Sequence, residues 1–147
     1  MEYKEVNLTN DLSDRLLQLS KDWELENSCY GYIANGVSDI EGNRIFVAVD
    51  DGIIIGYLFG HMSQSENMKS IMPEGTTFFE IEELYVIPQF RSKGVGSSLF
   101  SFATTQIKET AEYAVLSTAT KNWKAILHFY IEELGMEFWS ARLYKKL

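Results

Sequence analysis

Length, composition and charge set broad limits on what this chain is. Its 147 residues suit one domain of ordinary size, and a hydrophobic content of 46% indicates a packed globular protein. Lys and Arg number 13 against 21 Asp and Glu, and the resulting charge of −8 argues against general nucleic-acid binding, which needs a basic surface. An acidic surface is compatible with a cationic substrate, and it also serves simply to keep a protein soluble.

Cysteine usage and the absence of targeting patterns narrow the environment. The one cysteine, Cys29, excludes an internal disulfide and a cysteine-rich zinc site, and we expect it to be a packing residue. His61 and His128 are separate and flanked by apolar residues, so no metal site is predicted. The first residues lack the pattern of a signal peptide, and the longest apolar stretch, 53–59, is too short to span a bilayer. These features predict a cytoplasmic protein without a membrane partner.

The first half of the chain predicts a strand, a helix and a hairpin. Residues 3–9 alternate as a short strand, and the apolar residues from Leu12 to Trp23 recur at helical spacing. The stretch 27–42 is broken by three glycines and predicts a short helix or a loop. Two strands, 44–50 and 53–62, flank an Asp-Gly turn and predict a hairpin.

The second half of the chain alternates strands with helices. The predicted elements are a loop (63–76), a strand (78–87), a helix (95–110), a strand (113–119), a helix (122–134) and a terminal strand or strand pair (136–146). This order is an antiparallel meander followed by a βαβ crossover. It predicts a single α/β (α+β) domain over residues 1–147, with a central, mostly antiparallel mixed sheet flanked by helices on both faces.

An anion-binding turn is predicted between the third central strand and the helix that follows it. Pro88 stops the strand, and the run Arg91-Ser92-Lys93-Gly94-Val95-Gly96-Ser97 opens the helix. The first turn of a helix leaves N–H groups unpaired and carries the positive end of the helix dipole. Glycine lets that backbone approach an anion closely, and Arg91 and Lys93 add positive charge on an otherwise acidic chain. A pyrophosphate is the expected ligand.

Two other glycine-rich motifs do not fit this segment. A P-loop needs four residues between its glycines and a following Lys-Ser/Thr pair, which is absent. A dinucleotide fingerprint that starts at Gly94 would have Leu99 in place of its third glycine. An ordinary helix start with flexible glycines is the remaining alternative, and the position directly after a strand and a proline favours phosphate binding over it.

The order of the elements, this turn, and Asn122 followed by Tyr130 and Leu134-Gly135-Met136 resemble the GNAT acetyltransferase superfamily. The resemblance covers most of the chain, is specific from Phe78 to Gly135, and is vague before Arg44. It implies a GNAT-like acyl-CoA N-acyltransferase fold. It also implies an acetyl-CoA-dependent N-acetyltransferase that uses no metal.

The same resemblance assigns residues to the cofactor. It implies that the backbone of Leu84, Tyr85 and Val86 binds the pantetheine arm of acetyl-CoA, and that residues 92–97 cradle the pyrophosphate. It implies that Asn122 contacts the cofactor and that Tyr130 lies near the thioester sulfur. A splay between two central strands would give the thioester room against the sheet.

Acyl transfer to an amine calls for a base, because only about one in a thousand lysine-like amines is neutral at pH 7. Strand alternation predicts Glu80 and Glu82 on the face of Leu84 and Val86, with Glu83 on the other face. Glu82 is our first candidate for the base, directly or through a water, and Glu80 the second. Grouped carboxylates also bind an ammonium and hold its proton more tightly, so binding is an alternative role. A second alternative is that these glutamates have no catalytic role and lie at the solvent-facing start of the strand.

Tyr130 is the candidate acid that protonates the leaving thiolate. It follows Asn122 by eight residues, one more than the family's usual spacing. Either the helix carries a bulge, or Phe129 occupies the usual position and no acid is present. The resemblance further implies that the backbone N–H of Val86 or a neighbour holds the oxyanion.

The acceptor amine is the least determined part of the prediction. In GNAT-like folds the segment that follows the first helix walls the acceptor pocket, and here its structure is poorly predicted. Trp23, Glu26 and Tyr30 from this region are candidate substrate residues, together with Glu83 from the strand 78–87. Acids mixed with aromatics suit a polyamine, an aminoglycoside or a peptide amine, and ordinary loop and core residues are an equally good interpretation. A small cationic amine is the first candidate acceptor. A protein or peptide amine is the alternative acceptor, and a non-catalytic acyl-CoA sensor is the alternative function. Terminal strands and sheet edges also allow a homodimer.

Overall fold

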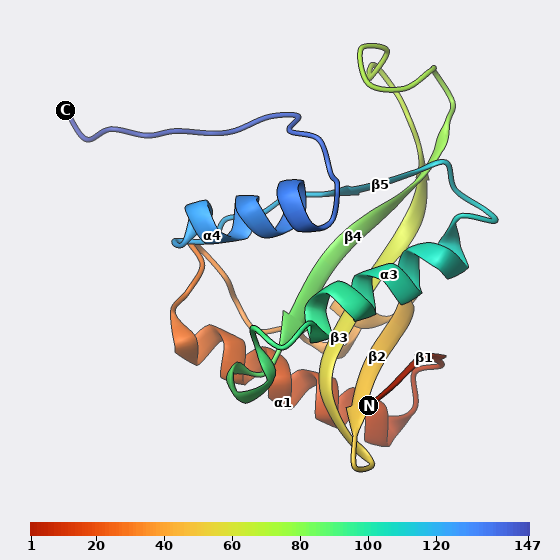
Figure 1. Cartoon of the computed structure of the whole chain (residues 1–147), viewed down its shortest axis with the longest axis vertical. Helices are drawn as coiled ribbons and strands as arrows, with labels where there is room; N and C mark the ends of the chain where they lie inside the picture. The colour runs from red at the N-terminus through yellow and green to blue at the C-terminus, as the bar shows by residue number, and fades with distance from the viewer.

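One five-stranded sheet organises the computed structural model, which describes residues 1–147 (Figure 1). The strands lie in the order β1-β2-β3-β4-β5; the first four are antiparallel neighbours, and β5 is parallel to β4. Their bounds are Glu2–Val6, Arg44–Asp50, Ile53–Gln64, Thr77–Val86 and Tyr113–Leu116. The predicted meander followed by a crossover is therefore confirmed.

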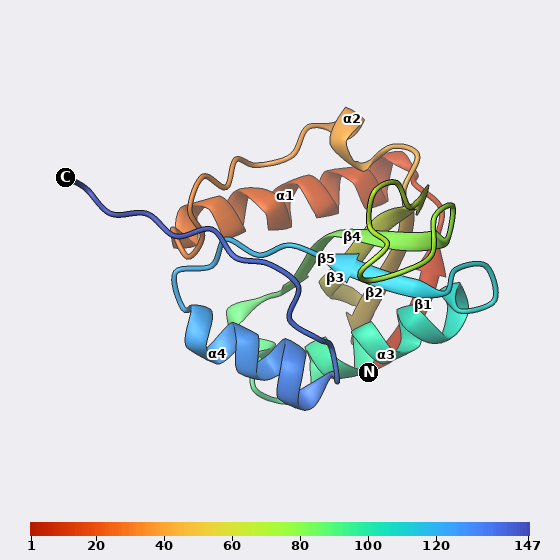
Figure 2. The ribbon, with the colours of Figure 1, turned by 90° about the horizontal axis from the view of Figure 1, so that it is seen from above.

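Helices cover both faces of this sheet, as the sequence predicts (Figures 1 and 2). α1 (Asn10–Glu26) and α2 (Val37–Ile40) lie on one side, and α3 (Val95–Ile107) and α4 (Trp123–Leu127) lie on the other. A short 3-10 helix η1 (Pro88–Phe90) precedes α3, and a π-helical segment η2 (His128–Glu133) continues α4. Thr9 is the N-cap of α1, and its hydroxyl accepts a hydrogen bond from Leu12 N at 3.3 Å.

Each face of the sheet has its own hydrophobic core. On the α1 side, Leu16 and Leu19 pack with Tyr57 and Tyr85 of the sheet. On the α3 side, Leu99 and other residues of that helix pack against a different set of strand residues. The strand residues on the α3 side are Phe46, Ala48, Ile55, Leu58, Phe79, Ile81 and Val86. The core to which a strand residue belongs shows which face of the sheet its side chain occupies.

A β-bulge in β4 overturns the predicted faces of Glu80 and Glu82, whereas Glu83 lies opposite Leu84 and Val86 as predicted. Phe59 is paired with Glu83, and the next residue, Gly60, is paired with Ile81, so Glu82 is an extra residue in the ladder. Leu84 and Val86 pack on the α3 side, whereas Glu83 is hydrogen-bonded to Tyr57 in the α1-side core. The prediction that Glu80 and Glu82 share a face with Leu84 and Val86 is wrong, because the bulge shifts the alternation by one residue.

β4 and β5 pair over a short length and then separate. The parallel pairing joins only Phe78–Ile81 to Tyr113–Leu116, so Leu84 to Val86 have no partner on the β5 side. Beyond β5 the chain pairs elsewhere: Tyr30 N donates to Ala119 O at 2.8 Å, and Lys121 N donates to Ser28 O at 2.9 Å. The two strands therefore enclose an opening that starts next to the bulge.

One predicted strand is absent, and another ends earlier than predicted. No strand follows η2, although the sequence predicts one or two over 136–146; the segment beyond Met136 is exposed and pairs with no strand of its own chain. β5 ends at Leu116 rather than at residue 119, because residues 119–121 turn to pair with the segment after α1. Alternating sequence predicts a strand only where a neighbouring edge is available.

Gly60, opposite the bulge, gives a direct test of this packing. A Cβ at Gly60 would clash with the carbonyl oxygen of Glu80 and lie 2.9 Å from Phe79 Cε1. We therefore expect Gly60→Ala to lower the free energy of unfolding by about 3 kcal/mol or more, as measured by urea denaturation.

Gly36→Ala is the matched control for that substitution. The nearest atom to a Cβ there is Asp39 Oδ2 at 3.7 Å, so the loss should stay below about 1 kcal/mol. Equal effects at the two glycines would contradict the bulge geometry.

Candidate active site

The turn before α3 has the backbone conformation that an anion cradle needs. Gly94 is the N-cap of α3 with φ +82°, and a Cβ there would meet no atom within 4 Å. The N–H groups of Val95, Gly96 and Ser97 donate to no other group of the chain. Three donors therefore converge at the positive end of a 13-residue helix.

Gly96 lies at a contact between three elements, although neither its conformation nor the space around it demands glycine. A Cβ there would lie 3.4 Å from Phe129 Cζ and 3.9 Å from Val86 Cγ2. Gly96 is thus the point where α3, the end of β4 and η2 approach one another.

Arg91 binds protein groups instead of extending freely toward the turn. Its Nε donates to Val86 O at 2.7 Å, and its guanidinium contacts Glu26 Oε1 at 2.8 Å. Tyr85 Oη donates to the same oxygen at 2.6 Å. Arg91 and Glu26 therefore join the end of α1 to the end of β4. Glu26, a predicted substrate residue, binds Arg91 and Tyr85 of its own chain. Of the two predicted cations, Lys93 alone makes no ion pair, and it lies over the Phe90 ring at 5.6 Å.

The bulge brings Glu80 and Glu82 together with a histidine. Glu82 is 46% exposed at its side chain, and its Oε1 lies 3.4 Å from His61 Nδ1. Burial and the nearby Glu82 charge raise the pKa of Glu80, whereas His61 lowers it. One oxygen of Glu80, Oε2, is buried without a hydrogen-bond partner. His61 is a residue that the sequence interpretation missed; the register between β3 and β4, which pairs His61 with Glu80, is the signal that identifies it.

Glu83 is held by its own chain. It accepts hydrogen bonds from Tyr57 Oη at 2.8 Å, from Tyr32 Oη at 3.0 Å and from Asn35 Nδ2 at 2.9 and 3.0 Å. Burial is the largest influence and raises its pKa, while these bonds lower it. Glu83 therefore anchors the segment after α1 to the sheet. Tyr57 and Asn35 were not predicted, because nothing local in the sequence marks them.

Trp23 packs against the tyrosines that surround Glu83. Its ring lies 4.3 Å from that of Tyr32 and 5.1 Å from that of Tyr85, measured between centroids. Trp23 therefore supports the Glu83 network, whereas Tyr30, also a predicted substrate residue, is 55% exposed and has Lys121 Nζ 5.5 Å from its ring.

The helix after β5 does carry a bulge, one of the two alternatives raised by its spacing. Leu134 N donates to Phe129 O at 3.0 Å, an i to i−5 bond that widens the helix into a π-turn. Phe129 faces Gly96, whereas Tyr130 lies close enough to Cys29 for that thiol to influence it. Burial raises the pKa of Tyr130 to about 12, so its phenol keeps its proton at neutral pH.

Asn122 lies at the entrance to this helix. It is the exposed N-cap of α4, and its side chain makes no capping hydrogen bond. Its amide is therefore free to bind another group.

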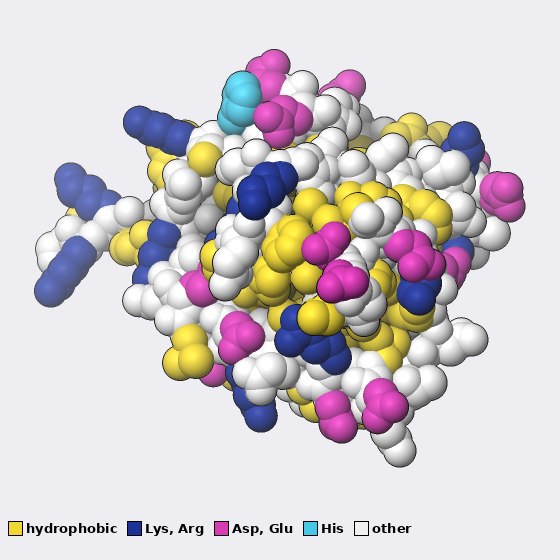
Figure 3. All heavy atoms as spheres, turned by 60° about the horizontal axis from the view of Figure 1, so that its bottom comes forward, with side chains coloured by type: hydrophobic (Ala, Val, Ile, Leu, Met, Phe, Trp, Pro, Cys, Tyr) yellow, Lys and Arg dark blue, Asp and Glu magenta, His cyan; other side chains and the backbone are white.

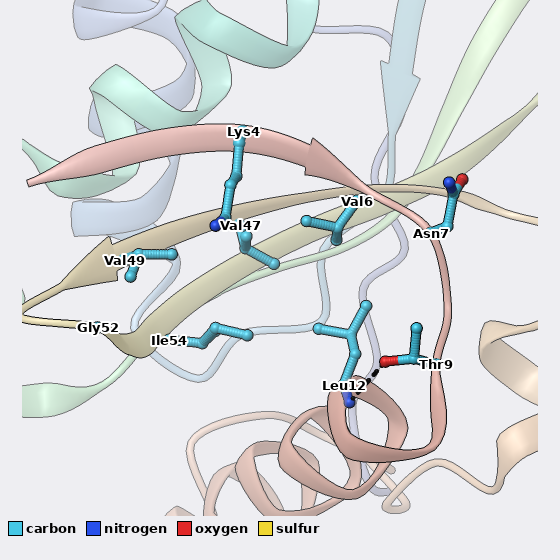
Figure 4. Close-up of a pocket in the computed structure, with 9 residues that line it drawn as sticks. All are labelled: Lys4, Val6, Asn7, Thr9, Leu12, Val47, Val49, Gly52 and Ile54. Atoms are coloured by element: carbon cyan, nitrogen blue, oxygen red, sulfur yellow. Dashed lines mark hydrogen bonds between the residues drawn. The ribbon is translucent and has the colours of Figure 1, made fainter.

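Two hollows lie near the α1 face of the sheet. The larger, about 430 Å³, is formed by β1, the start of α1 and the β2–β3 turn (Figure 4), and none of the candidate residues lines it. The smaller, about 290 Å³, is lined in part by Glu26, Tyr85 and Pro88, beside the turn. On the face shown in Figure 3, charged side chains of both signs surround a hydrophobic area. No group of acidic, histidine or cysteine side chains has a geometry that could hold a metal, and no helix is long and apolar enough to cross a membrane.

Comparison with protein families identifies the chain. Residues 10–136 match the model of the Acetyltransferase (GNAT) family, so the chain belongs to this family and is an acetyl-CoA-dependent N-acetyltransferase. No curated protein matches the sequence detectably.

Solved structures share the fold over the whole chain. A transcriptional regulator from Bacillus halodurans is 20% identical with a TM-score of 0.72, covering 99% of this chain and 100% of its own. An aminoglycoside N-acetyltransferase in complex with CoA is 17% identical with a TM-score of 0.66, covering 99% of each chain. A ribosomal-protein-alanine N-acetyltransferase from Brucella melitensis is 15% identical with a TM-score of 0.69, covering 99% and 100%.

The raised pKa values of Glu80 and Glu83 lead to a pH prediction. Each carboxyl binds its proton more tightly in the folded chain than in the unfolded one, whose ordinary pKa is 4.5. Both groups therefore make the free energy of unfolding fall as the pH rises from 4.5 through their folded pKa values. In urea denaturation from pH 4 to 7, Glu83→Gln should lose less stability over this window than the parent chain.

Glu66→Gln, in the exposed loop after β3, controls for the change in net charge. If Glu66→Gln and Glu83→Gln had the same pH dependence, burial of Glu83 would not be the cause.

Proposed function

We propose that this enzyme transfers the acetyl group of acetyl-CoA to a primary amine of a small cationic molecule, of the polyamine or aminoglycoside kind. One observation carries the proposal: the β4 bulge places Glu80, Glu82 and His61 beside the opening between β4 and β5. Carboxylates at that opening suit an ammonium substrate approaching from the α1 side.

The donor would bind on the α3 side of this opening. The free N–H groups of Val95, Gly96 and Ser97 would bind the pyrophosphate, together with the backbone of Ser92 to Gly94 and the side chain of Lys93. The pantetheine arm would lie along the free edge of β4 at Leu84, Tyr85 and Val86. Asn122 would contact it from α4. Arg91 would act on this site mainly by fixing the Val86 carbonyl.

The transfer would proceed by direct attack of the amine on the thioester. Glu82, directly or through a water, takes the proton of the ammonium, and Glu80 is the second candidate. The free amine attacks the thioester carbonyl, and the backbone N–H of Val86 or a neighbour holds the oxyanion of the tetrahedral intermediate. The intermediate then collapses: the C–S bond breaks, and the nitrogen releases its second proton as the amide forms. Tyr130, which is half-buried and keeps its proton at neutral pH, gives that phenolic proton to the departing thiolate and takes up the proton that the amide nitrogen releases.

The proposed acceptor class rests on the negative charge of the chain and on the exposure of Glu82. The whole chain carries −8, and Glu82 is half exposed at the bulge, so a cation can reach it. An aminoglycoside acetyltransferase and a ribosomal-protein-alanine acetyltransferase both share the fold, so a protein or peptide amine is the alternative acceptor. A thiol-release assay with spermidine, an aminoglycoside and a lysine-containing peptide separates them. Preference for the peptide would overturn the small-molecule proposal, and acetyl-CoA binding without turnover on any amine would indicate a sensor.

Gly94 tests the phosphate turn. Its positive φ favours Gly and Asn, so Gly94→Asn keeps the turn at modest cost, whereas Gly94→Asp adds a negative charge of nearly the same shape. Titration calorimetry with CoA should show at least a tenfold loss of affinity for Asp relative to Asn, equivalent to about 1.4 kcal/mol. Equal affinity in the two variants would place the pyrophosphate elsewhere.

Tyr130 and Glu82 test the chemistry. We expect Tyr130→Phe to lower kcat by about 100-fold with little change in the KM for acetyl-CoA. Glu82→Gln should lower kcat most at neutral pH and less at high pH, where the free amine is more abundant. Tyr113→Phe, an exposed tyrosine on β5, is the control. Unchanged kcat in Tyr130→Phe would remove Tyr130 from the mechanism.

A further inference from the structure

His61 is a titratable residue beside the β4 bulge that has no part in the proposed reaction. It lies on β3, where it pairs with Glu80. Phe59, two residues before it, packs in the α1-side core, and Met62, directly after it, packs against the α3-side core. Strand alternation therefore directs the imidazole of His61 to the α1 side of the sheet, which is also the side of Glu83.

Glu82 lies next to both this imidazole and the opening between the strands. The pairing of β4 with β5 ends at Ile81, so Glu82 is the first β4 residue beyond it. Its Oε1 lies 3.4 Å from His61 Nδ1, and both side chains reach solvent, with exposed fractions of 46% for Glu82 and 42% for His61. The imidazole and an amine that enters the opening would therefore approach the same carboxylate.

Glu80 is influenced by the same histidine. Burial, followed by the charge of Glu82, raises the pKa of Glu80, whereas a positive charge on His61 lowers it. One oxygen of Glu80, Oε2, is buried without a hydrogen-bond partner. A charge on His61 thus acts on both carboxylates of β4 that adjoin the bulge.

The charged groups of the other neighbouring elements are bound elsewhere. On β2, Arg44 pairs with Glu5 and lies over the ring of Phe46, which belongs to the core on the α3 side. On α2, Asp39 accepts a hydrogen bond from Gly36 N at 2.8 Å. The two glutamates of β4 are therefore the charged groups that the imidazole faces.

Protonation would change what His61 does to these carboxylates. With a neutral imidazole, the ionised pair Glu80 and Glu82 attracts a cation with two negative charges. A protonated imidazole places a positive charge 3.4 Å from Glu82 Oε1, where it offsets one of those charges and repels an ammonium ion. Histidine is the side chain whose ordinary charge change lies between pH 5 and 8, so this difference falls within the working range of an enzyme.

We propose that His61 sets the affinity of the site for the acceptor amine by acting through Glu82. Neutral His61 leaves both carboxylates available to the ammonium, and protonated His61 competes with the ammonium for Glu82. The side chain thus makes acceptor binding depend on pH without touching the reacting atoms. This role rests on the proposed transfer of acetyl to a cationic amine at the opening.

The KM for the amine, measured against pH, tests this role. The acceptor is spermidine, the aminoglycoside or the lysine-containing peptide, whichever the parent chain turns over, with acetyl-CoA saturating. The ratio of the amine KM in the parent to that in His61→Gln should fall from about 5 at pH 5.5 to about 1 at pH 8, because the variant lacks the competing charge. Titration of the amine itself cancels in this ratio, and the KM for acetyl-CoA should be the same in both proteins.

His128→Gln is the matched control. His128 is exposed at the start of η2, which continues α4 on the α3 side of the sheet, away from the carboxylates (Figure 2). The corresponding KM ratio for this variant should stay near 1 at both pH values.

NMR titration of the two imidazoles tests the pairing without turnover. His61→Gln identifies which signal belongs to which histidine. Glu82→Gln removes the carboxylate beside His61, so the titration midpoint of His61 should fall by about 0.3 pH units or more, while that of His128 stays the same.

The outcomes separate this role from the proposed function. A KM ratio for His61→Gln that does not change with pH, or a His61 midpoint unaffected by Glu82→Gln, would overturn the role of His61 and leave the acetyl transfer intact. Absence of thiol release with every amine of the panel at pH 8 would overturn the proposed function, and the role of His61 with it.

Discussion

The extra residue in β4 determines where the carboxylates of the proposed site lie. Opposite Phe59 and Gly60, the strand fits Glu82 between Ile81 and Glu83, and Gly60 lacks the Cβ that would clash with this arrangement. The bulge moves Glu83 to the α1 side, where Tyr32, Tyr57 and Asn35 bind it. It also lies where β4 and β5 cease to pair. One local irregularity thus positions the three carboxylates and coincides with the point where the strands separate.

Charge is distributed unevenly around that opening. On the α3 side, unpaired N–H groups at the start of α3 provide a positive site without a free arginine, since Arg91 is bound by Glu26 and Val86. On the α1 side lie the carboxyl groups of Glu80, Glu82 and Glu83. An anionic cofactor and a cationic amine would therefore be attracted to opposite faces of one sheet, and they would meet where the strands separate.

The sequence predicted the elements with strong local patterns, and it failed where distant residues decide. The hairpin around Asp51-Gly52, the strand–proline–glycine turn and the α3 periodicity all hold, because each depends on residues close together in the chain. The β4 bulge was not predictable from alternation alone, since it depends on pairing with β3. The role of Arg91 as a bridge and the Glu83 network depend on α1 and residues 32–35, far along the chain. The π-turn was predictable as an alternative, because an extra residue in a helix must be accommodated.

Amide hydrogen exchange measured by NMR, with and without CoA, tests the central claim most directly. The free N–H groups of Val95, Gly96 and Ser97 should exchange rapidly in the apo protein, because they have no partner. Saturating CoA should slow these three, together with amides at the free edge of β4 near Leu84 and Val86. Unchanged exchange at both places, with protection appearing instead around the hollow lined by Val6 and Ile54, would contradict the account.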